Sequence, residues 1–523
     1  MLFYSHKSSD MFKYFFIIVI LILPLSFFGQ KYLKQGDLAL DKEQYAQAIE
    51  LYSAQIKKSK RKAHLIAEAS FKIGYCYKKL SIPEESSEYF KKSIELKYPD
   101  PLQFLYYGEA LHMQQKYDSA LIQYEIFKDL ATDHKLANKG IESIDLTFLS
   151  IDNPTRHKVE LFAVLNSNEH DYCPFYEVRN KHKIYFTSGR YAPTHVSISP
   201  ESGEYCSNLF FSEQDKFGKW SKPSIVPGLV NTIDEEGASC LNHKSNNLYF
   251  TRCQYDKKKD KGCRIYVAKR VGSYWGQIKE VEIPGIPENI SIGHPAISDD
   301  ELTLYFVADS LLGGLGGKDI YKVVRERKNS PFGHPKNLGP YINTEADEIH
   351  PYIRSNGDLY FSSDGHAGIG GFDIFKAKHI SGVEYKVSNL GFPINSSRDD
   401  FGIVFIGMKE EGFLSSTRTG GLGKSDLYYF KLPSLDFTLS GTIYDKNTKE
   451  KMENVDIQIM NDEYILMDSQ QSDANGSYEI DLLPENNYII YYKLKGYHIA
   501  KEIVDIKTLT KSKHFLRDIY LEK

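Results

Sequence analysis

The fold is decided by an aromatic triplet that recurs through the middle of the chain: Ile184-Tyr185-Phe186, Leu248-Tyr249-Phe250, Leu304-Tyr305-Phe306, Leu359-Tyr360-Phe361 and, weaker, Gly412-Phe413-Leu414. The central residues of successive triplets are 64, 56, 55 and 53 positions apart. A period of this length is typical of stacked or radial repeats. An acidic or His-Pro turn precedes each triplet, and a glycine-rich or charged loop with a second strand follows it. Residues 157–433 are therefore predicted to form a five-bladed, WD-repeat-like β-propeller with four strands in each blade.

The first and last copies of this repeat differ in where their outer strand lies in the sequence. The copy that ends at Leu432 lacks an outer strand, whereas residues 159–166, ahead of the first copy, resemble an orphan outer strand. Pairing these residues with residues 426–430 would close the ring and leave no open sheet edge. We expect the ring to be closed by this strand pairing, which we call the seal, between the two ends of the repeat region.

Residues 31–150 show apolar and small residues at helical spacing. Three segments align on Gly36, Gly74 and Gly108, which are 38 and 34 residues apart, and they resemble tetratricopeptide repeats. An ordinary helical bundle is the alternative. The resemblance implies that the first helix of each pair lines a concave groove, where four side chains would face a protein partner instead of being merely solvated: Tyr75, Lys78, Glu109 and His112.

Residues 436–523 alternate apolar and polar side chains in several short strands. Their order, with Gly441-Thr442-Ile443-Tyr444-Asp445 first and a turn at Asp473-Ala474-Asn475-Gly476, resembles the carboxypeptidase regulatory-like domain, a transthyretin-type β-sandwich. Asp473 and Asn475 are too few oxygen ligands for calcium and are interpreted as turn formers. The predicted fold class is thus multidomain α + all-β, because a chain of 523 residues is too long for one core.

Residues 15–28 form an apolar run that follows Lys7 and Lys13. The run has the length of a signal-peptide core and is short for a membrane-spanning helix. We predict a signal peptide over residues 1–30, with Met1 or Met11 as the start, and export to the periplasm. An uncleaved membrane anchor is the alternative.

Charge and cysteine content exclude several classes of protein. The net charge of −4 and pI of about 6.5 argue against nucleic-acid binding, which needs a basic stripe. The six cysteines include no CxxC pair, so no metal site is expected. Cys253 and Cys263 flank a predicted hairpin and could form a disulfide in an oxidising compartment, or remain two unpaired thiols.

No complete catalytic constellation or phosphate-binding loop is present in the sequence. Glycine-rich segments such as residues 313–318 recur before predicted strands, so hairpin geometry explains them better than nucleotide binding does. The aspartates that follow these segments are expected to bond the loop backbone: Asp319, Asp373 and Asp426. No catalytic residue, cofactor or metal is therefore predicted.

The order of modules resembles Bacteroidetes envelope proteins of the PorE type within the OmpA family. This resemblance implies a non-enzymatic periplasmic scaffold that binds envelope proteins, associated with the outer membrane and with type IX secretion or gliding machinery. The chain lacks the C-terminal OmpA-like domain, so direct peptidoglycan binding is not supported. The alternative is a glycan-binding protein or envelope enzyme that uses the central pocket of the propeller, with these candidates at the channel mouth: His294, His350, Asp347, Glu348, Asp399 and Asp400.

Overall fold

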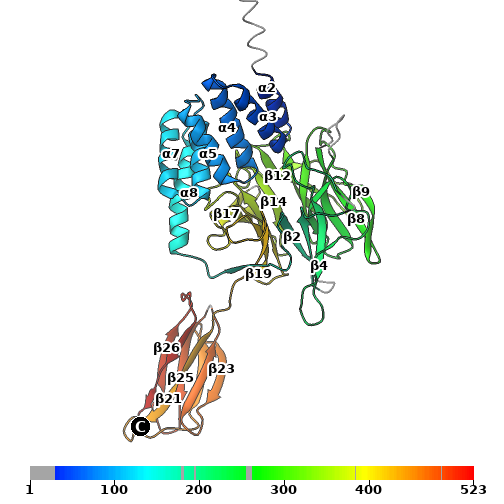
Figure 1. Cartoon of the computed structure of the whole chain (residues 1–523). Coiled ribbons are helices and arrows are strands. Elements are labelled where there is room, and N and C mark those ends of the chain that lie inside the picture. Colours follow the sequence, from blue (N-terminus) through cyan, green and yellow to red (C-terminus); the bar gives the residue numbers. More distant parts are fainter. Residues whose placement is uncertain (1–29, 178–181, 194–195, 255–261, 383, 485) are drawn as a thin grey trace, which may run out of the picture. The chain divides into compact units, whose positions relative to one another are not determined.

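The computed structural model describes residues 30–177, 182–193, 196–254, 262–382, 384–484 and 486–523 (Figure 1). The chain forms two compact units, residues 1–431 and 432–523. The predicted signal peptide falls on residues 1–29, outside the described ranges. Within those ranges no helix is long and apolar enough to span a bilayer.

The first unit begins with a helical layer in which consecutive helices pack against one another. Glycines in the first helix of a pair make room for aromatic rings of the second: a Cβ on Gly74 would lie 3.0 Å from the Phe90 ring, and one on Gly108 would lie 2.6 Å from the Tyr124 ring. The helices are α2 (Lys31–Leu40), α3 (Tyr45–Lys58), α4 (Ala63–Lys79), α5 (Pro83–Glu95), α6 (Leu102–Met113), α7 (Tyr117–Leu130) and α8 (Lys135–Asp152).

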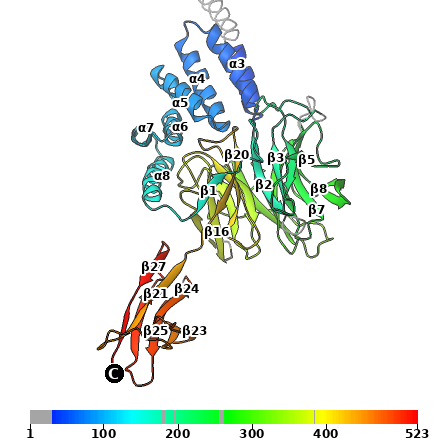
Figure 2. The same ribbon diagram turned by 60° about the horizontal axis from the view of Figure 1, so that its bottom comes forward.

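Five four-stranded antiparallel sheets follow among the described residues of this unit. Their first strands contact each other in cyclic order, and β18 returns to β2, so the sheets form a closed ring of blades (Figure 2). Phe186, Phe250, Phe306 and Phe361 from the recurring triplets are fully buried between blades. The strands, blade by blade, are β2 (Asp171–Glu177), β3 (Lys183–Ser188), β4 (Asn208–Glu213) and β5 (Ser224–Ile225); β6 (Glu235–Leu241), β7 (Asn247–Gln254), β8 (Gly262–Val271) and β9 (Tyr274–Glu280); β10 (Ile292–Ile297), β11 (Thr303–Asp309), β12 (Lys318–Val324) and β13 (Lys336–Asn337); β14 (Glu348–Ile353), β15 (Leu359–Ser363), β16 (Asp373–Ser381) and β17 (Glu384–Asn389); β18 (Asp400–Phe405), β19 (Glu411–Ser416), β20 (Asp426–Lys431) and β1 (Lys158–Leu161).

The last blade takes its outer strand from the start of the repeat region. Strand β1 pairs with β20 in the register Val159↔Phe430, which is the pairing expected from the phase of the repeats. Asn166 fixes this seal, because its side chain both donates to the Leu427 carbonyl (3.0 Å) and accepts from the Leu427 amide (2.8 Å). The same two-way bond recurs in three other blades, through Asn231, Asn343 and Asn395.

The innermost strand of every blade carries one β-bulge. The register with the second strand breaks in β2, β6, β10, β14 and β18. A bulge re-aims a side chain and is often found beside functional sites. The bulged residues all have positive φ, and four of the five are not glycine: Cys173 (50°), Ala238 (43°), His294 (49°), His350 (51°) and Gly402 (61°).

The second unit is a pair of sheets around its own core, which includes Leu439, Ile457 and Tyr492. One sheet has the order β23-β22-β25-β26, and in the other β21 pairs with β24, β27 and β28. The strands are β21 (Phe437–Asp445), β22 (Asp456–Asn461), β23 (Leu466–Gln471), β24 (Ser477–Leu482), β25 (Asn487–Lys493), β26 (Ala500–Asp505), β27 (Lys513–Leu516) and β28 (Ile519–Leu521).

The predicted fold class needs correction outside the propeller. The chain is mostly β, and its seven described helices are confined to an N-terminal stretch. Glycines that admit aromatic rings also occur in closely packed helix pairs of other folds, so that pattern alone does not identify tetratricopeptide repeats. Likewise, alternation of apolar residues marks a half-buried strand but not its partners, and β21 pairs in parallel with β27 and β28. The identification of a transthyretin-type sandwich is therefore not supported.

Candidate functional site

The ring of blades has one mouth that is lined by equivalent residues of all five blades. At the outer level lie the residues at or just before the start of the innermost strands: His170, Glu235, Ser291, Asp347 and Asp399. One level deeper lie Tyr172, Gly237, Gly293, Ile349 and Phe401. They border a cavity of about 470 Å³, which we call the chamber.

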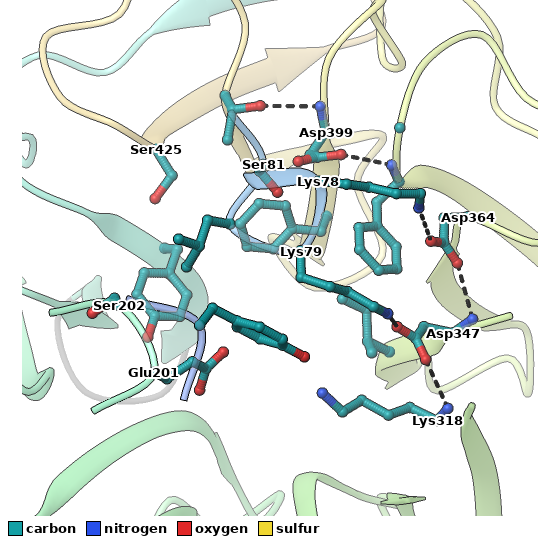
Figure 3. A pocket seen from close by; sticks show the side chains of 18 of the residues that line it. Lys78, Lys79, Ser81, Glu201, Ser202, Lys318, Asp347, Asp364, Asp399 and Ser425 are labelled. Carbon is teal, nitrogen blue, oxygen red and sulfur yellow. Dashed lines mark hydrogen bonds and ion pairs between the residues drawn. The ribbon is translucent and has the colours of Figure 1, made fainter. Parts of the chain in front are cut away.

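The helical layer covers this mouth with the turns between its helices. The α2–α3, α4–α5 and α6–α7 turns contain Glu43, Ser81 and Gln115, each with φ near 60°. In the first turn region the Ala46 amide donates to the Glu201 carbonyl (2.9 Å), and in the third the Gln115 side chain bonds Ser397 (3.1 Å). The end of α4 and the turn after it bring Lys78, Lys79 and Ser81 into the chamber (Figure 3).

The wall of the chamber contains an ion pair that is partly exposed to solvent. Lys318 and Glu43 both line the chamber, with their charged groups 3.5 Å apart, and their side chains remain 33% and 45% exposed. This pair joins the propeller to the helical layer.

Asp347 is held ionised at the chamber wall. Its Oδ2 lies 2.7 Å from Lys79 Nζ, and its Oδ1 accepts the backbone amide of Lys318 at 2.9 Å. Burial opposes the charge of this carboxylate, but the nearby Lys79 and Lys318 ammonium groups outweigh burial and lower its pKa to about 2. Asp347 therefore stays deprotonated near neutral pH and acts in the chamber as a charged hydrogen-bond acceptor.

Asp399 occupies the equivalent position in the neighbouring blade but has the opposite environment. Its Oδ1 accepts the Phe372 amide at 2.8 Å, while its Oδ2 has no hydrogen-bond partner among the described residues. The residue is only 4% exposed, and burial raises its pKa despite the neighbouring Ser81 hydroxyl. Two carboxyl groups whose pKa values are pushed apart in one site are suited to acid–base chemistry.

The side chains predicted to face a protein partner lie against the propeller of the same chain. Lys78 Nζ is 3.4 Å from Glu109 and 3.7 Å from Asp364 of the propeller. His112 is buried and its Nε2 lies 3.0 Å from the Thr147 hydroxyl, and burial lowers its pKa to about 4. Tyr75 lines a wider space at the same junction, of about 1300 Å³.

The two histidines named at the channel mouth lie deeper, where they plug the channel. The rings of His294 and His350 stack with centroids 3.9 Å apart, and Cys173 Sγ lies 3.3 Å from His350 Nδ1. Burial lowers the pKa of both imidazoles well below the usual range. A second cavity of about 350 Å³ begins on the far side of this plug, lined by Phe175 and Tyr352 among others.

Glu348 and Asp400 support the fold and do not border the chamber, unlike Asp347 and Asp399, which directly precede them in the sequence. Both are fully buried; Glu348 accepts the Ser363 hydroxyl (2.7 Å), and Asp400 pairs with Arg418 (2.5 Å). Of the six residues named for the alternative function, Asp347 and Asp399 border the chamber, and His294 reaches it from the plug.

The structure also locates the predicted disulfide and the aspartates of the glycine-rich loops. A disulfide joins Cys253 to Cys263 across β7 and β8 at the edge of the chamber. The predicted role of Asp319, Asp373 and Asp426 is confirmed, since each carboxylate accepts a loop amide at 2.6, 2.5 and 2.8 Å. No cluster of His, Cys, Asp or Glu among the described residues could hold a metal ion.

Sequence reasoning missed Lys79, Ser81 and Lys318. Lys79 ends α4, Ser81 lies in the turn that follows, and Lys318 comes after a glycine-rich loop, so each looks like an ordinary polar surface residue. Only the docking of the helical layer onto the propeller brings them together. The one local signal was Ser81-Ile82-Pro83, which marks a turn between two helices.

Comparisons with known proteins identify no family. No family model matches the chain, and no curated protein matches it. Similar solved structures include an α-L-arabinofuranosidase from Podospora anserina (10% identity, 51% of this chain and 93% of that one, TM-score 0.33) and an arabinanase from Bacillus subtilis (12%, 51% and 94%, 0.34). An exo-β-1,3-galactanase from Clostridium thermocellum covers more of this chain (10%, 68% and 82%, 0.36). At these TM-scores the likeness carries no argument about activity.

These findings correct the family assignment. No comparison connects the chain with PorE-type or OmpA-family proteins, and the similar structures named above are glycoside hydrolases. The resemblance was based on local patterns and module order, which unrelated proteins share. The non-enzymatic scaffold and the link to type IX secretion depended on it and are withdrawn. The prediction that the chain is not an enzyme, which also relied on the lack of a recognisable catalytic motif, is withdrawn as well. Export to the periplasm and binding of envelope proteins stay predictions.

Proposed function

We propose that the chamber is a carbohydrate-binding site. The observation that carries this proposal is the convergence of carboxylates, ammonium groups and hydroxyls from several blades and from one helical turn in a single cavity: Asp347, Asp399, Lys79, Lys318 and Ser81. The cavity volume of about 470 Å³ lies in the range of small-molecule sites.

The mixture of charges favours a neutral ligand with many hydroxyl groups. An apolar ligand would leave these polar groups desolvated and unpaired, which is costly. A phosphorylated ligand would meet the carboxylates as well as the lysines. A sugar offers both donors and acceptors, and Tyr45, Tyr172 and Phe401 supply apolar faces to the same cavity.

Binding is tested by calorimetric titration of the full chain with neutral oligosaccharides of pentoses and hexoses. We expect saturable binding of at least one of them, and Asp399→Asn should weaken it by about tenfold or more, since a hydrogen bond to a charged or polar buried group is at stake. Glu213→Gln is the matched control, because Glu213 pairs with Lys183 outside the chamber and its loss should leave affinity unchanged. Equal effects of the two variants would contradict the proposal.

A second candidate function is hydrolysis of the bound glycan, favoured by the opposite pKa shifts of Asp399 and Asp347. Asp399 would protonate the glycosidic oxygen as the bond to the anomeric carbon breaks. Asp347 would take a proton from the water that attacks this carbon. Lys79 must first leave Asp347, because their ion pair occupies the base.

Release of new reducing ends distinguishes hydrolysis from binding alone. If the chain hydrolyses its ligand, Asp347→Asn should abolish the rate while the oligosaccharide still binds. Binding without any release of reducing ends by the unmodified chain would leave carbohydrate binding as the function and eliminate the hydrolytic role.

A further inference from the structure

The helical layer and the propeller border a larger space beside the chamber. This space has a volume of about 1300 Å³, and we call it the groove. Helices α4, α6 and α8 line one side of it, and loops of the third and fourth blades line the other. The groove is almost three times as large as the chamber, whose volume is about 470 Å³.

The chamber and the groove share a wall of ion-paired side chains. Lys78 and Lys139 both pair with Glu109, at 3.4 and 3.5 Å. Lys79 pairs with Asp347, and the backbone amide of Asp347 donates to Asp364 Oδ1 at 2.9 Å (Figure 3). Three lysines and three carboxylates therefore line both cavities: Lys78, Lys79, Lys139, Glu109, Asp347 and Asp364.

On the groove side, the helices offer aromatic rings and free hydrogen-bonding groups. The rings of Tyr75 in α4 and Tyr106 in α6 have centroids 5.7 Å apart. Asn138 and Glu142 lie one turn apart on α8, and both are exposed. Within the described part of the chain, the Tyr75 hydroxyl and the side chains of Asn138 and Glu142 have no hydrogen-bond partner. The groove thus presents apolar faces together with free donors and acceptors, which is what a sugar ring also presents.

We propose that the groove binds the continuation of the sugar chain whose end occupies the chamber, so that the protein selects oligosaccharides over short sugars. This inference rests on the carbohydrate binding proposed for the chamber. The shared wall selects the occupant, because a ligand in the chamber is separated from the groove only by these side chains. An apolar ligand would displace water from Asn138 and Glu142 without replacing its hydrogen bonds. A highly charged polymer would meet both signs of charge in the wall.

A sugar chain that occupies both cavities has to displace part of the shared wall. Lysine carries its ammonium group on a flexible four-carbon stem, so Lys78 and Lys79 can move aside without a change of the backbone. Sugar hydroxyls both donate and accept hydrogen bonds. They can therefore donate to the carboxylates that the lysines leave and accept from the displaced ammonium groups.

The test is calorimetric titration of the full chain with the disaccharide and the hexasaccharide of neutral cello-, xylo- and galacto-oligosaccharide series. In a series that binds, we expect the hexasaccharide to bind at least about tenfold more tightly than the disaccharide, because it gains contacts in the groove. Tyr75→Ala should weaken binding of the hexasaccharide by about fivefold, as expected for one aromatic contact, and leave the disaccharide unchanged. Asp399→Asn, in the chamber, should weaken both.

Tyr77→Ala is the matched control. Tyr77 also belongs to α4, but its ring stacks on Tyr89, with centroids 5.7 Å apart, outside both cavities. Its loss should leave both affinities unchanged. If Tyr75→Ala weakened both lengths equally, Asn138→Ala would decide, because it changes an exposed side chain: selective loss of the hexasaccharide would support the groove, and no loss would overturn it.

The outcomes separate this inference from the function on which it rests. Equal affinity for the two lengths, with Tyr75→Ala without effect, would overturn the role of the groove and leave binding in the chamber intact. No binding in any series would remove the carbohydrate function itself, and the inference with it.

Discussion

Lys79 at the end of α4 and Asp347 of the fourth blade form an ion pair of 2.7 Å across 268 residues of sequence. The pair joins the helical layer to the mouth of the propeller and stands in the wall of the chamber (Figure 3). The same contact that holds the two parts together thus occupies an ionised carboxylate in the wall of the chamber.

We expect Lys79→Ala to lower the free energy of unfolding of the first unit by roughly 1–3 kcal/mol, because it leaves a mostly buried carboxylate with one cation fewer. Urea unfolding measures the loss. Lys135→Ala is a matched control, since Lys135 also crosses to the propeller, at Glu345, but both side chains are more than half exposed. Its effect should stay below about 1 kcal/mol. A control that cost as much as Lys79→Ala would contradict this account of the junction.

Acid should weaken the junction through Asp347. The pKa of this carboxyl is lowered to about 2 from 3.8, so its folded form binds the proton less readily than its unfolded form. The stabilisation is complete above about pH 4 and is lost as the pH falls through 2, and it amounts to roughly 2 kcal/mol. Urea unfolding between pH 5 and pH 2 should therefore show a steeper loss for the unmodified chain than for Asp347→Asn. Parallel curves would show that this carboxylate is not the group responsible.

The helix pairs should be intolerant of a single methyl group. Gly108→Ala would place a Cβ 2.6 Å from the Tyr124 ring, and overpacking of this kind costs about 1–3 kcal/mol. Gly189→Ala serves for comparison, because its Cβ would meet nothing closer than 3.8 Å. Thermal unfolding of the two variants gives the difference, and similar melting temperatures would argue against the close packing described.

Removal of residues 158–166 should open the ring. The deletion takes away β1 and Asn166, and leaves the backbone groups of β20 unpaired at a sheet edge. We expect the shortened chain to aggregate in size-exclusion chromatography. A monomer with the melting temperature of the full chain would show that the seal is dispensable.

Local patterns predicted what depends on neighbouring residues. The aromatic triplets marked the central strands, and the Asp residues after the glycine-rich loops bond those loops because an Asp beside a tight turn can satisfy its amides. The phase of the repeats indicated where β1 and β20 pair.

The site depended on contacts that such patterns do not encode. Lys79 meets Asp347 only because one helical turn docks onto the mouth of the ring. The bulge at His350 turns this side chain into the channel, although its sequence position beside Asp347 suggested a place at the mouth. The family and the scaffold role were inferred from the order of modules, which does not encode such contacts either, and both inferences were wrong.

The central claim is that the chamber binds a carbohydrate, and the most direct measurement is a crystal structure of the full chain soaked with the neutral oligosaccharide that binds best in titration. We predict sugar density in the chamber, with hydroxyl groups within hydrogen-bond distance of Asp399 and Ser81. Density only in the second cavity beyond His294 and His350, or an empty chamber at saturating oligosaccharide, would contradict the claim.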